Sequence, residues 1–362
     1  MLYDNTMILD KNPKLKKKID EIIYTNQVNT WAAGLFNEVC NYTDFFSKDK
    51  IDNYVKQGLK EEAALVEIIY DEFNFDKDDE ETRKISEEYC VKQIKCLDPK
   101  PYLDDLYVKT ISANGRYDKY ALKMIKYEPY QTFAYDEIEV TKDYKEYSRI
   151  GYFKKPFSYL ALTEGNNIWM SLNPNEIETM KPFVNKAHGN VLVLGLGMGY
   201  VPFMMANKSE VKHITIIERD EKIIKLFNNV LFPHFINKNK ITIIKDDAIK
   251  YTSKNNKYNY IFADLWHNPE DGLDLFIKLK RINKNIDCWL DVSLAAMLRR
   301  CMITLIEESL EGLNDNNYKK AKNTTDRVIN HYYEVTKNLV INNEDDLLNL
   351  LSDESLINLA IK

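Results

Sequence analysis

Residues 189–202 read Gly-Asn-Val-Leu-Val-Leu-Gly-Leu-Gly-Met-Gly-Tyr-Val-Pro. The apolar run 190–194 is typical of a strand that is buried on both faces of a sheet covered by helices. Pro202 suits the first turn of a helix, where its missing N–H is not needed. Glycines allow the main chain between these two elements to bend sharply and to approach a ligand closely. They stand at Gly195, Gly197 and Gly199. The stretch predicts a strand, a ligand-binding turn and a helix N-terminus.

A second strand is predicted at Lys212–Ile217, and it ends at an acidic residue, Glu218. Glu218 comes nineteen residues after Gly199, a distance that fits a crossover helix followed by a return strand. The carboxylate would therefore emerge beside the glycine turn, where it can accept hydrogen bonds from both hydroxyls of a ribose. The two motifs together predict a nucleoside-binding site.

Two classes of cofactor are bound by such a site, and the glycine spacing favours one of them. In the dinucleotide fingerprint Gly-x-Gly-x-x-Gly, the third glycine would fall on Tyr200, whose side chain would hinder packing of the helix on the strand. The stretch instead resembles motif I, Gly-x-Gly-x-Gly, of the class I S-adenosylmethionine (AdoMet)-dependent transferases. Many members have an acid where Val193 stands. The resemblance implies AdoMet as the cofactor, bound by Gly195, Gly197, Gly199 and Glu218.

The resemblance continues along two further strands. Lys240–Lys245 is predicted to be the third strand, and Asp246-Asp247-Ala248 after it is similar to the Asp-Ala pair that the family places against the adenine. A fourth strand at Tyr258–Ala263 ends in Asp264, where the family keeps groups on the acceptor side. The resemblance therefore implies that Asp247 and Asp264 also bind the cofactor.

The residues after the fourth strand supply the candidate catalytic groups. A protonated amine or a hydroxyl acceptor needs a base, and Asp264 and His267 are the candidates. Asp264 is the better placed, although it also fits a role in ordering the loop or in binding the amino group of the methionine moiety. His267 fits an ordinary loop histidine better than a catalytic one. Trp266 fits either a wall of the substrate pocket or packing over the edge of the sheet.

The leading hypothesis is a methyltransferase that uses AdoMet to modify a small molecule or a protein side chain. Methyl transfer from a sulfonium is an in-line displacement, which needs alignment and exclusion of water more than a particular catalytic residue. An alternative is an aminopropyltransferase, similar in layout to spermidine synthase, that uses decarboxylated AdoMet. That family has a second acid after the fourth strand, whereas Asp264-Leu265-Trp266-His267-Asn268-Pro269 has none. A third alternative is a non-catalytic nucleotide-binding module.

The composition limits the partners and the location. The chain of 362 residues is 44% hydrophobic and 29% charged, with a net charge of −6, which gives no general attraction to nucleic acid or to an anionic membrane. The five cysteines have neither disulfide nor metal-ligand spacing, so no metal is expected. No apolar run approaches the length of a membrane span, and the first residues do not resemble a secretion signal. We expect a cytoplasmic protein, with an oligomer possible.

The fold class expected is α/β, with a doubly wound, mostly parallel sheet preceded by helices and a small β lead-in. Strands at 158–162 and 167–172 flank a turn and predict a hairpin before the glycine strand. A fifth strand is expected at 286–292 and another strand at 335–341. The predicted regions are a helical N-terminal region at 1–98, the hairpin-containing lead-in at 99–182, the AdoMet-binding Rossmann-like domain at 183–312, and a mostly helical tail at 313–362.

Overall fold

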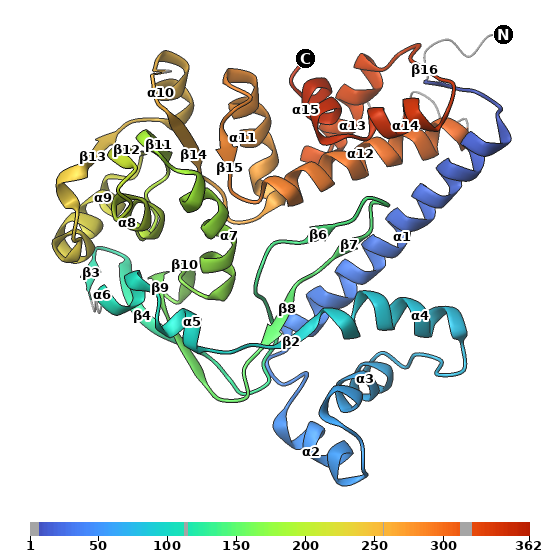
Figure 1. Ribbon diagram of the computed structural model, residues 1–362, viewed down its shortest axis with the longest axis horizontal. Coiled ribbons are helices and arrows are strands. Elements are labelled where there is room, and N and C mark those ends of the chain that lie inside the picture. Colours follow the sequence, from blue (N-terminus) through green and yellow to red (C-terminus); the bar gives the residue numbers. More distant parts are fainter. Residues whose placement is uncertain (1–6, 112–114, 256, 312–320) are drawn as a thin grey trace. The chain divides into compact units, whose positions relative to one another are not determined.

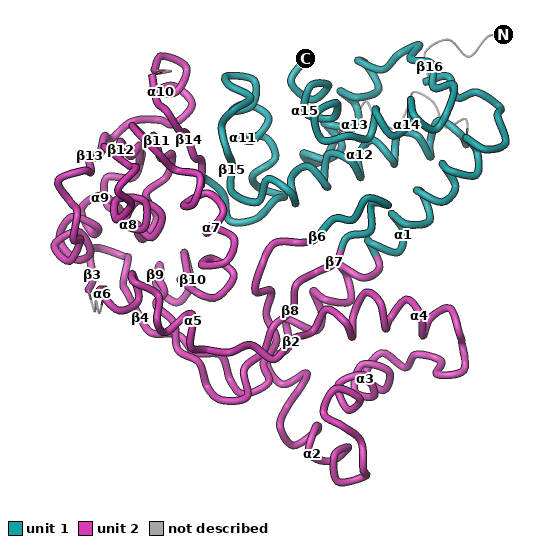
Figure 2. Tube along the Cα trace, viewed as in Figure 1, with its two compact units in different colours: residues 1–30, 139–146, 265–362 teal, residues 31–138, 147–264 magenta. Residues whose placement is uncertain are grey.

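The computed structural model describes residues 7–111, 115–255, 257–311 and 321–362 (Figure 1). The chain divides into two compact units (Figure 2). Unit 1 comprises residues 1–30, 139–146 and 265–362, and unit 2 comprises residues 31–138 and 147–264. Among the described residues, no helix has both the length and the apolar character that a bilayer span requires.

Unit 2 contains the parallel sheet that the sequence predicts. Its strands lie in the order β13-β12-β11-β14, and each pair of neighbours is parallel. Their bounds are β11 Gly189–Leu194, β12 Val211–Glu218, β13 Ile241–Lys245 and β14 Tyr260–Ala263. The helices between them are α8 Tyr200–Ala206, α9 Glu221–Leu226 and α10 Ala248–Lys254. This alternation of parallel strands and helices confirms the expected fold class.

The sheet has this form because its central strand is apolar on both faces. All four residues from Val191 to Leu194 are at most 1% exposed. Val193 lies opposite Ile216 on one side and Phe262 on the other. A strand buried on both faces needs helices above and below it, and the crossover helices provide that cover. Because β11 has β12 on one side and β14 on the other, the strand order reverses at β11, and ligands of such sheets bind at this point beyond the carboxyl ends of the strands.

The lead-in contains the predicted hairpin. Strands β9 (Phe157–Glu164) and β10 (Asn167–Ser171) pair antiparallel around Gly165, whose φ is 61°. They belong to a sheet of order β10-β9-β4-β3, with β4 at Tyr120–Tyr127 and β3 at Arg116–Tyr117. Helix α7 (Pro174–Lys186) follows and is capped by the side chain of Asn173. The hairpin therefore leads into the helix that precedes the glycine strand.

The N-terminal region is mostly helical, as predicted. Its helices are α1 Pro13–Asn41, α2 Lys48–Lys56, α3 Glu61–Glu72 and α4 Glu80–Tyr89. The lead-in that follows begins with two short helices, α5 Lys100–Leu103 and α6 Leu106–Thr110. Short strands lie in the N-terminal region at β1 Ile8–Leu9 and β2 Ile94–Cys96. The lead-in has four more, β5 Phe133–Ala134, β6 Glu139–Val140, β7 Glu146–Tyr147 and β8 Ile150–Tyr152. Single helical turns lie at Val91–Gln93, Phe227–Leu231, Phe232–His234 and Lys238–Lys240.

In unit 1, two of the predicted strands are much shorter than expected. The strand expected at 286–292 is wrong beyond β15 (Asp287–Cys288), because Leu290 has a φ of 59° and the chain enters α12 at Asp291. The strand expected at 335–341 is also wrong, because helix α13 runs through Val335 and only Val340–Ile341 is extended. This short strand, β16, pairs with β1. The helices of this part are α11 Pro269–Ile282, α12 Asp291–Glu311, α13 Thr324–Val335, α14 Glu344–Leu350 and α15 Asp353–Ala360.

Candidate functional site

The glycine turn lies directly after β11 and has a backbone that only glycine adopts easily. Gly195, Gly197 and Gly199 have φ values of 100°, 53° and 77°. A Cβ at Gly199 would lie 2.3 Å from Cε2 of Phe227, so a side chain there would also meet the core. The N–H of Gly199 donates to the carbonyl of Leu196 over 2.9 Å and closes the turn. The main chain is therefore bare and sharply bent where the sequence predicts a nucleoside.

Glu218 ends β12 and is bonded to the glycine turn. One carboxylate oxygen accepts the N–H of Leu196 at 3.2 Å, and the other accepts the N–H of Asp220 at 2.8 Å. Each carboxylate oxygen has a second lone pair, so these bonds leave capacity for two ribose hydroxyls. The structure brings Glu218 beside the turn, as the spacing of the two motifs predicts.

Asp264 follows β14 and lies next to the end of β11. Its N–H donates to the carbonyl of Leu194 at 2.8 Å, which extends the pairing of the two strands by one residue. Burial, followed by the charge of Glu218, raises the pKa of Asp264 to about 7. This carboxyl group titrates near neutral pH, which suits a group that must exchange a proton.

The sequence interpretation missed a second acid, Glu176. It lies in the first turn of α7, where its N–H donates to the Asn173 side chain over 3.0 Å. Burial, followed by the charge of Asp264, raises its pKa well above the usual range. The sequence did contain a signal that Glu176 is partly buried. Glu176 immediately precedes Ile177, which is 2% exposed, so it borders the inward face of the helix. The structure thus groups carboxylates from three elements, namely Glu176, Glu218 and Asp264.

Asp247 lies after β13, at the same edge of the sheet. Its side chain is exposed and caps α10 by accepting the N–H of Lys250 over 2.8 Å. The preceding residue, Asp246, donates its N–H to the carbonyl of Glu218 over 3.2 Å, which joins this loop to the end of β12. The predicted contact of Asp247 with an adenine stays a prediction.

Trp266 and His267 belong to unit 1 and have partners of their own there. Trp266 is 5% exposed, and its Nε1–H donates to the carbonyl of Trp289 over 3.2 Å. A Cβ at Gly272 would lie 2.6 Å from Cγ of Trp266, so the indole packs directly on α11. His267 is exposed, and its Nδ1 lies 3.1 Å from a carboxylate oxygen of Asp271. These contacts favour the packing role for Trp266 and the loop role for His267, and any part in substrate binding or catalysis stays a prediction.

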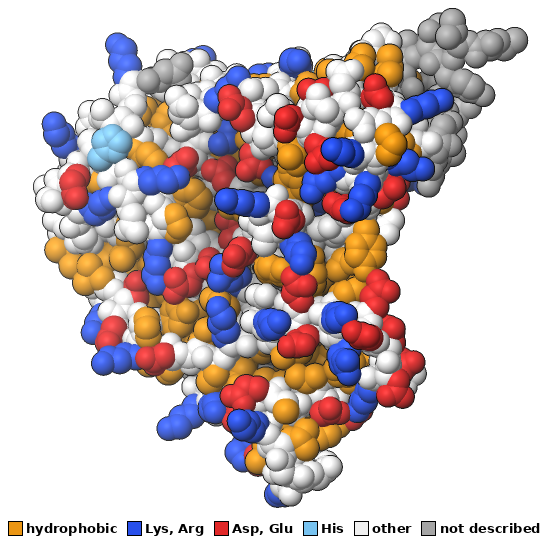
Figure 3. All heavy atoms as spheres, turned by 45° about the vertical axis from the view of Figure 1, so that its right-hand side comes forward, with side chains coloured by type: hydrophobic (Ala, Val, Ile, Leu, Met, Phe, Trp, Pro, Cys, Tyr) orange, Lys and Arg blue, Asp and Glu red, His pale blue; other side chains and the backbone are white. Residues whose placement is uncertain are grey.

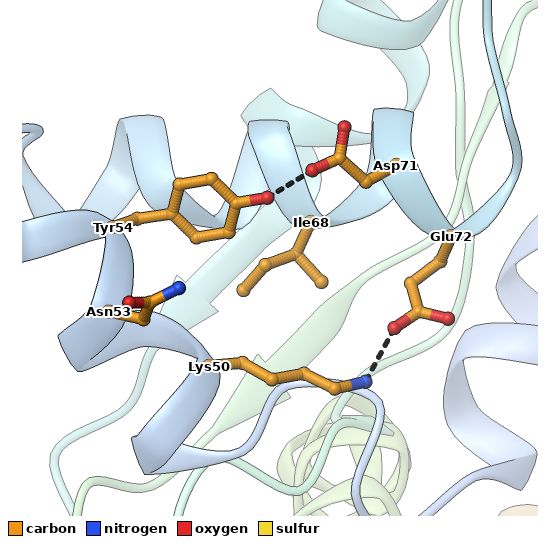
Figure 4. A pocket seen from close by; sticks show the side chains of 6 residues that line it. All are labelled: Lys50, Asn53, Tyr54, Ile68, Asp71 and Glu72. Atoms are coloured by element: carbon orange, nitrogen blue, oxygen red, sulfur yellow. Dashed lines mark hydrogen bonds and ion pairs between the residues drawn. The ribbon is translucent and has the colours of Figure 1, made fainter. Parts of the chain in front are cut away.

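A hollow of about 190 Å³ lies between α2 and α3, among residues other than those predicted for the site (Figure 4). The Tyr54 hydroxyl donates to Asp71, and Lys50 Nζ lies 2.6 Å from Glu72. These polar groups already bond to one another and hold α2 against α3. On the face shown in Figure 3, basic and acidic side chains are interspersed, without a large area of one sign.

Comparisons with known proteins find similarity over part of the chain. Residues 175–284 match the family model described as spermine/spermidine synthase domain. No curated protein matches the sequence. Among solved structures, spermidine synthase from Thermotoga maritima is similar at 12% identity and a TM-score of 0.30, over 40% of this chain and 58% of that one.

Two other solved structures are similar to a comparable extent. A spermidine synthase in complex with the transition-state analogue AdoDATO has 14% identity and a TM-score of 0.29, over 40% of this chain and 58% of that one. Precorrin 8W decarboxylase from Methanobacterium thermoautotrophicum has 18% identity and a TM-score of 0.24, over 30% of this chain and 54% of that one. In each case the chain covers less than two thirds of the other protein.

The family match corrects the leading hypothesis from the sequence. The matched residues, 175–284, include α7, the glycine turn, Glu218, Asp247 and Asp264. The match supports the resemblance to the class I AdoMet-type superfamily. Within that superfamily it points to spermine and spermidine synthases, so the methyltransferase interpretation is wrong and its aminopropyltransferase alternative is the better supported.

Proposed function

We propose that the chain is an aminopropyltransferase that transfers the aminopropyl group of decarboxylated AdoMet to an amine. The observation that carries this proposal is the spermine/spermidine synthase domain match over residues 175–284. The same residues contain the glycine turn and the carboxylates of Glu176, Glu218 and Asp264. The proposal therefore joins a family likeness to a set of groups whose chemistry suits the reaction.

The residues present fit a sulfonium nucleoside. The bare main chain at 195–199 would lie under the sugar, the Glu218 carboxylate would accept the ribose hydroxyls, and Asp247 would face the adenine. This donor supplies a carbon that is activated by the positive sulfur to which it is bonded. We expect Asp264 and Glu176 to lie toward the end of the nucleoside that carries the sulfur, because Asp264 lies next to the end of β11 and its charge acts on Glu176.

The charges of these residues favour the decarboxylated donor over AdoMet itself. The ionisable groups proposed for this end of the site, Glu176 and Asp264, are both acids. AdoMet would bring its own carboxylate next to them, and like charges at close range cost several kcal/mol, typically about 1–4. The decarboxylated donor has a sulfonium and an ammonium group and no carboxylate, so its charges complement those of the site.

Asp264 is the proposed general base. The neutral nitrogen of the acceptor amine attacks the carbon bonded to sulfur, a C–N bond forms, and the C–S bond breaks with its electron pair going to sulfur. The attacking nitrogen then loses a proton to the carboxylate of Asp264. Its pKa of about 7 lets it accept that proton and release it again near neutral pH. Glu176 supplies the second acid that the loop after β14 lacks, and a bound ammonium group would favour its anionic form.

The test is an assay of the purified chain with putrescine as the acceptor and either decarboxylated or ordinary AdoMet as the donor. We expect release of 5′-methylthioadenosine, detected by liquid chromatography, only with the decarboxylated donor and only when the amine is present. Calorimetry with 5′-methylthioadenosine provides an independent measure of nucleoside binding. Turnover with neither donor, together with no binding of the nucleoside at millimolar concentration, would remove the proposal. Binding without turnover of any amine would instead favour the nucleotide-binding module.

A further inference from the structure

A tyrosine from the lead-in segment is bonded to the glycine turn. Tyr107, in α6, is 0% exposed, and its hydroxyl donates to the main-chain carbonyl of Met198 over 2.5 Å. Met198 lies between two glycines of the turn. The peptide between Met198 and Gly199 is also bonded through its N–H, because the N–H of Gly199 donates to the carbonyl of Leu196. Rotation of the Met198–Gly199 peptide would therefore break two hydrogen bonds.

The side chain of Tyr107 is itself held in place. Its ring packs edge-on against Tyr200 and Phe203, with centroid separations of 5.6 and 5.2 Å. Its N–H donates to one carboxylate oxygen of Asp105 over 2.8 Å, and the Tyr200 hydroxyl donates to the other over 3.1 Å. Since Tyr200 begins α8, the single carboxylate of Asp105 links the N-terminus of α6 to that of α8. Burial raises the pKa of both tyrosines, so both hydroxyls remain donors across the physiological range.

Aromatic rings pack against the turn on the side of Gly199. The ideal Cβ position of Gly199 is 2.3 Å from Phe227 and 3.0 Å from Phe235. Phe235 also contacts Phe203 and Phe227, with centroid separations of 4.9 and 5.2 Å. A close-packed wall of this kind resists displacement of the whole turn. The freedom that is left to the glycines is rotation of their peptide planes, and the Tyr107 hydroxyl opposes that rotation.

We propose that Tyr107 is a positioning residue that sets the affinity of the site for its nucleoside by fixing the orientation of the Met198–Gly199 peptide. The inference rests on the proposed function for the identity of the ligand, but not for the effect on the turn. A turn that is already in its binding orientation loses less freedom when the nucleoside binds. Without the hydroxyl, the peptide would sample other orientations, and the apparent affinity would fall in proportion to the competent fraction.

The experiment compares Tyr107→Phe with a matched variant, Tyr332→Phe. Tyr332, in unit 1, is also 0% exposed, and its hydroxyl also donates to a main-chain carbonyl, that of Leu356, over 3.0 Å. Both variants keep the ring and lose one buried hydrogen bond, so we expect similar losses of thermal stability. Only Tyr107→Phe should weaken binding of 5′-methylthioadenosine, by about 5- to 10-fold, the factor that corresponds to one such bond. It should raise the KM for the donor and leave kcat unchanged.

Hydrogen exchange of the segment 195–200 in the ligand-free protein separates this inference from the proposed function. Faster exchange in Tyr107→Phe and unchanged exchange in Tyr332→Phe would support the positioning role even if the wild-type protein bound no nucleoside, an outcome that would remove the proposed function alone. Equal exchange and equal affinity in Tyr107→Phe and the wild type would overturn the inference. If Tyr107→Phe does not fold, Tyr200→Phe removes the bond to Asp105 and tests the same arrangement with the same measurements.

Discussion

Two aspartates of unit 2 have opposite surroundings. Asp71, in the hollow between α2 and α3, accepts hydrogen bonds from Tyr54 and from Lys77, whose Nζ lies 2.9 Å away, and these bonds lower its pKa. Asp264, at the end of β14, has its pKa raised to about 7 by burial and by the charge of Glu218. The same side chain is thus stabilised as an anion in one place and destabilised as an anion in the other.

The opposite pKa shifts of Asp71 and Asp264 distinguish an acid that stabilises the fold from one that is available to a ligand. Donors that surround Asp71 compensate its charge within the protein, so it has little to gain from an external cation. The charge on Asp264 is opposed by its surroundings, and a bound cation would relieve that cost. Perturbed acids of this kind cluster at functional sites.

The largest effect is expected from Asp264→Asn. Loss of the base should lower kcat of aminopropyl transfer by about 10²- to 10⁴-fold, because the asparagine amide cannot take the proton from the amine. The free energy of unfolding at neutral pH should not fall, since the variant removes a charge that the site disfavours. Asp71→Asn is the control and should leave kcat unchanged. Steady-state turnover and chemical denaturation measure the two quantities, and an unchanged kcat in Asp264→Asn would contradict the assignment of the base.

Glu218→Ala should weaken nucleoside binding by about 1.5–3 kcal/mol, as expected when charge-assisted hydrogen bonds are lost. Glu221→Ala is the matched control, because Glu221 also follows β12 but pairs with Lys225 and Lys245 at 2.7 and 2.6 Å. Calorimetric titration with 5′-methylthioadenosine measures the affinities. Equal affinity in Glu218→Ala and the wild type would place the ribose elsewhere.

The sheet and its glycine turn were predictable because their signals are local in the sequence. The alternate glycines from Gly195 to Gly199 permit positive φ, and the apolar run before them favours burial, so a few adjacent residues indicate both features. The strand expected at 286–292 was correct only at Asp287–Cys288, for a related reason. A short apolar run does not distinguish a buried strand from the buried start of a helix, and the left-handed backbone of Leu290 has no signal in the sequence.

The acidic part of the site was only half predictable. Asp264 follows a recognisable strand, whereas Glu176 comes from a helix that precedes the glycine strand, 88 residues earlier in the chain. Their mutual influence depends on how α7 packs against the sheet, which no local pattern encodes. The bond from Tyr107 to Met198 joins residues 91 positions apart and was missed for the same reason.

Stability should depend on pH in a way that identifies Asp264. Its pKa is about 7 in the folded chain and near the usual aspartate value of 3.8 when unfolded, so between these values the folded state binds more protons. The stabilisation from the protonated acid is complete below the unfolded pKa and is lost as the pH rises through about 7. We expect a loss of about 1–3 kcal/mol, reduced from the full shift because Asp264 is partly exposed. Denaturation from pH 4 to 8 should show a steeper decline in the wild type than in Asp264→Asn, in which Glu176 keeps a raised pKa. Parallel curves for the two proteins would contradict the raised pKa of Asp264.

The smallest effect is expected in the hollow between α2 and α3, where the acid is compensated. Asp71→Asn and Tyr54→Phe should each lower the free energy of unfolding by less than about 1 kcal/mol, because pairs that reach solvent are screened by water. A double-mutant cycle on the two residues isolates their coupling, which should be favourable and small. Affinity for 5′-methylthioadenosine should be unchanged in both variants. A large loss of nucleoside affinity in Asp71→Asn would break the comparison, because it would show that a compensated acid far from the glycine turn in sequence also acts on the ligand.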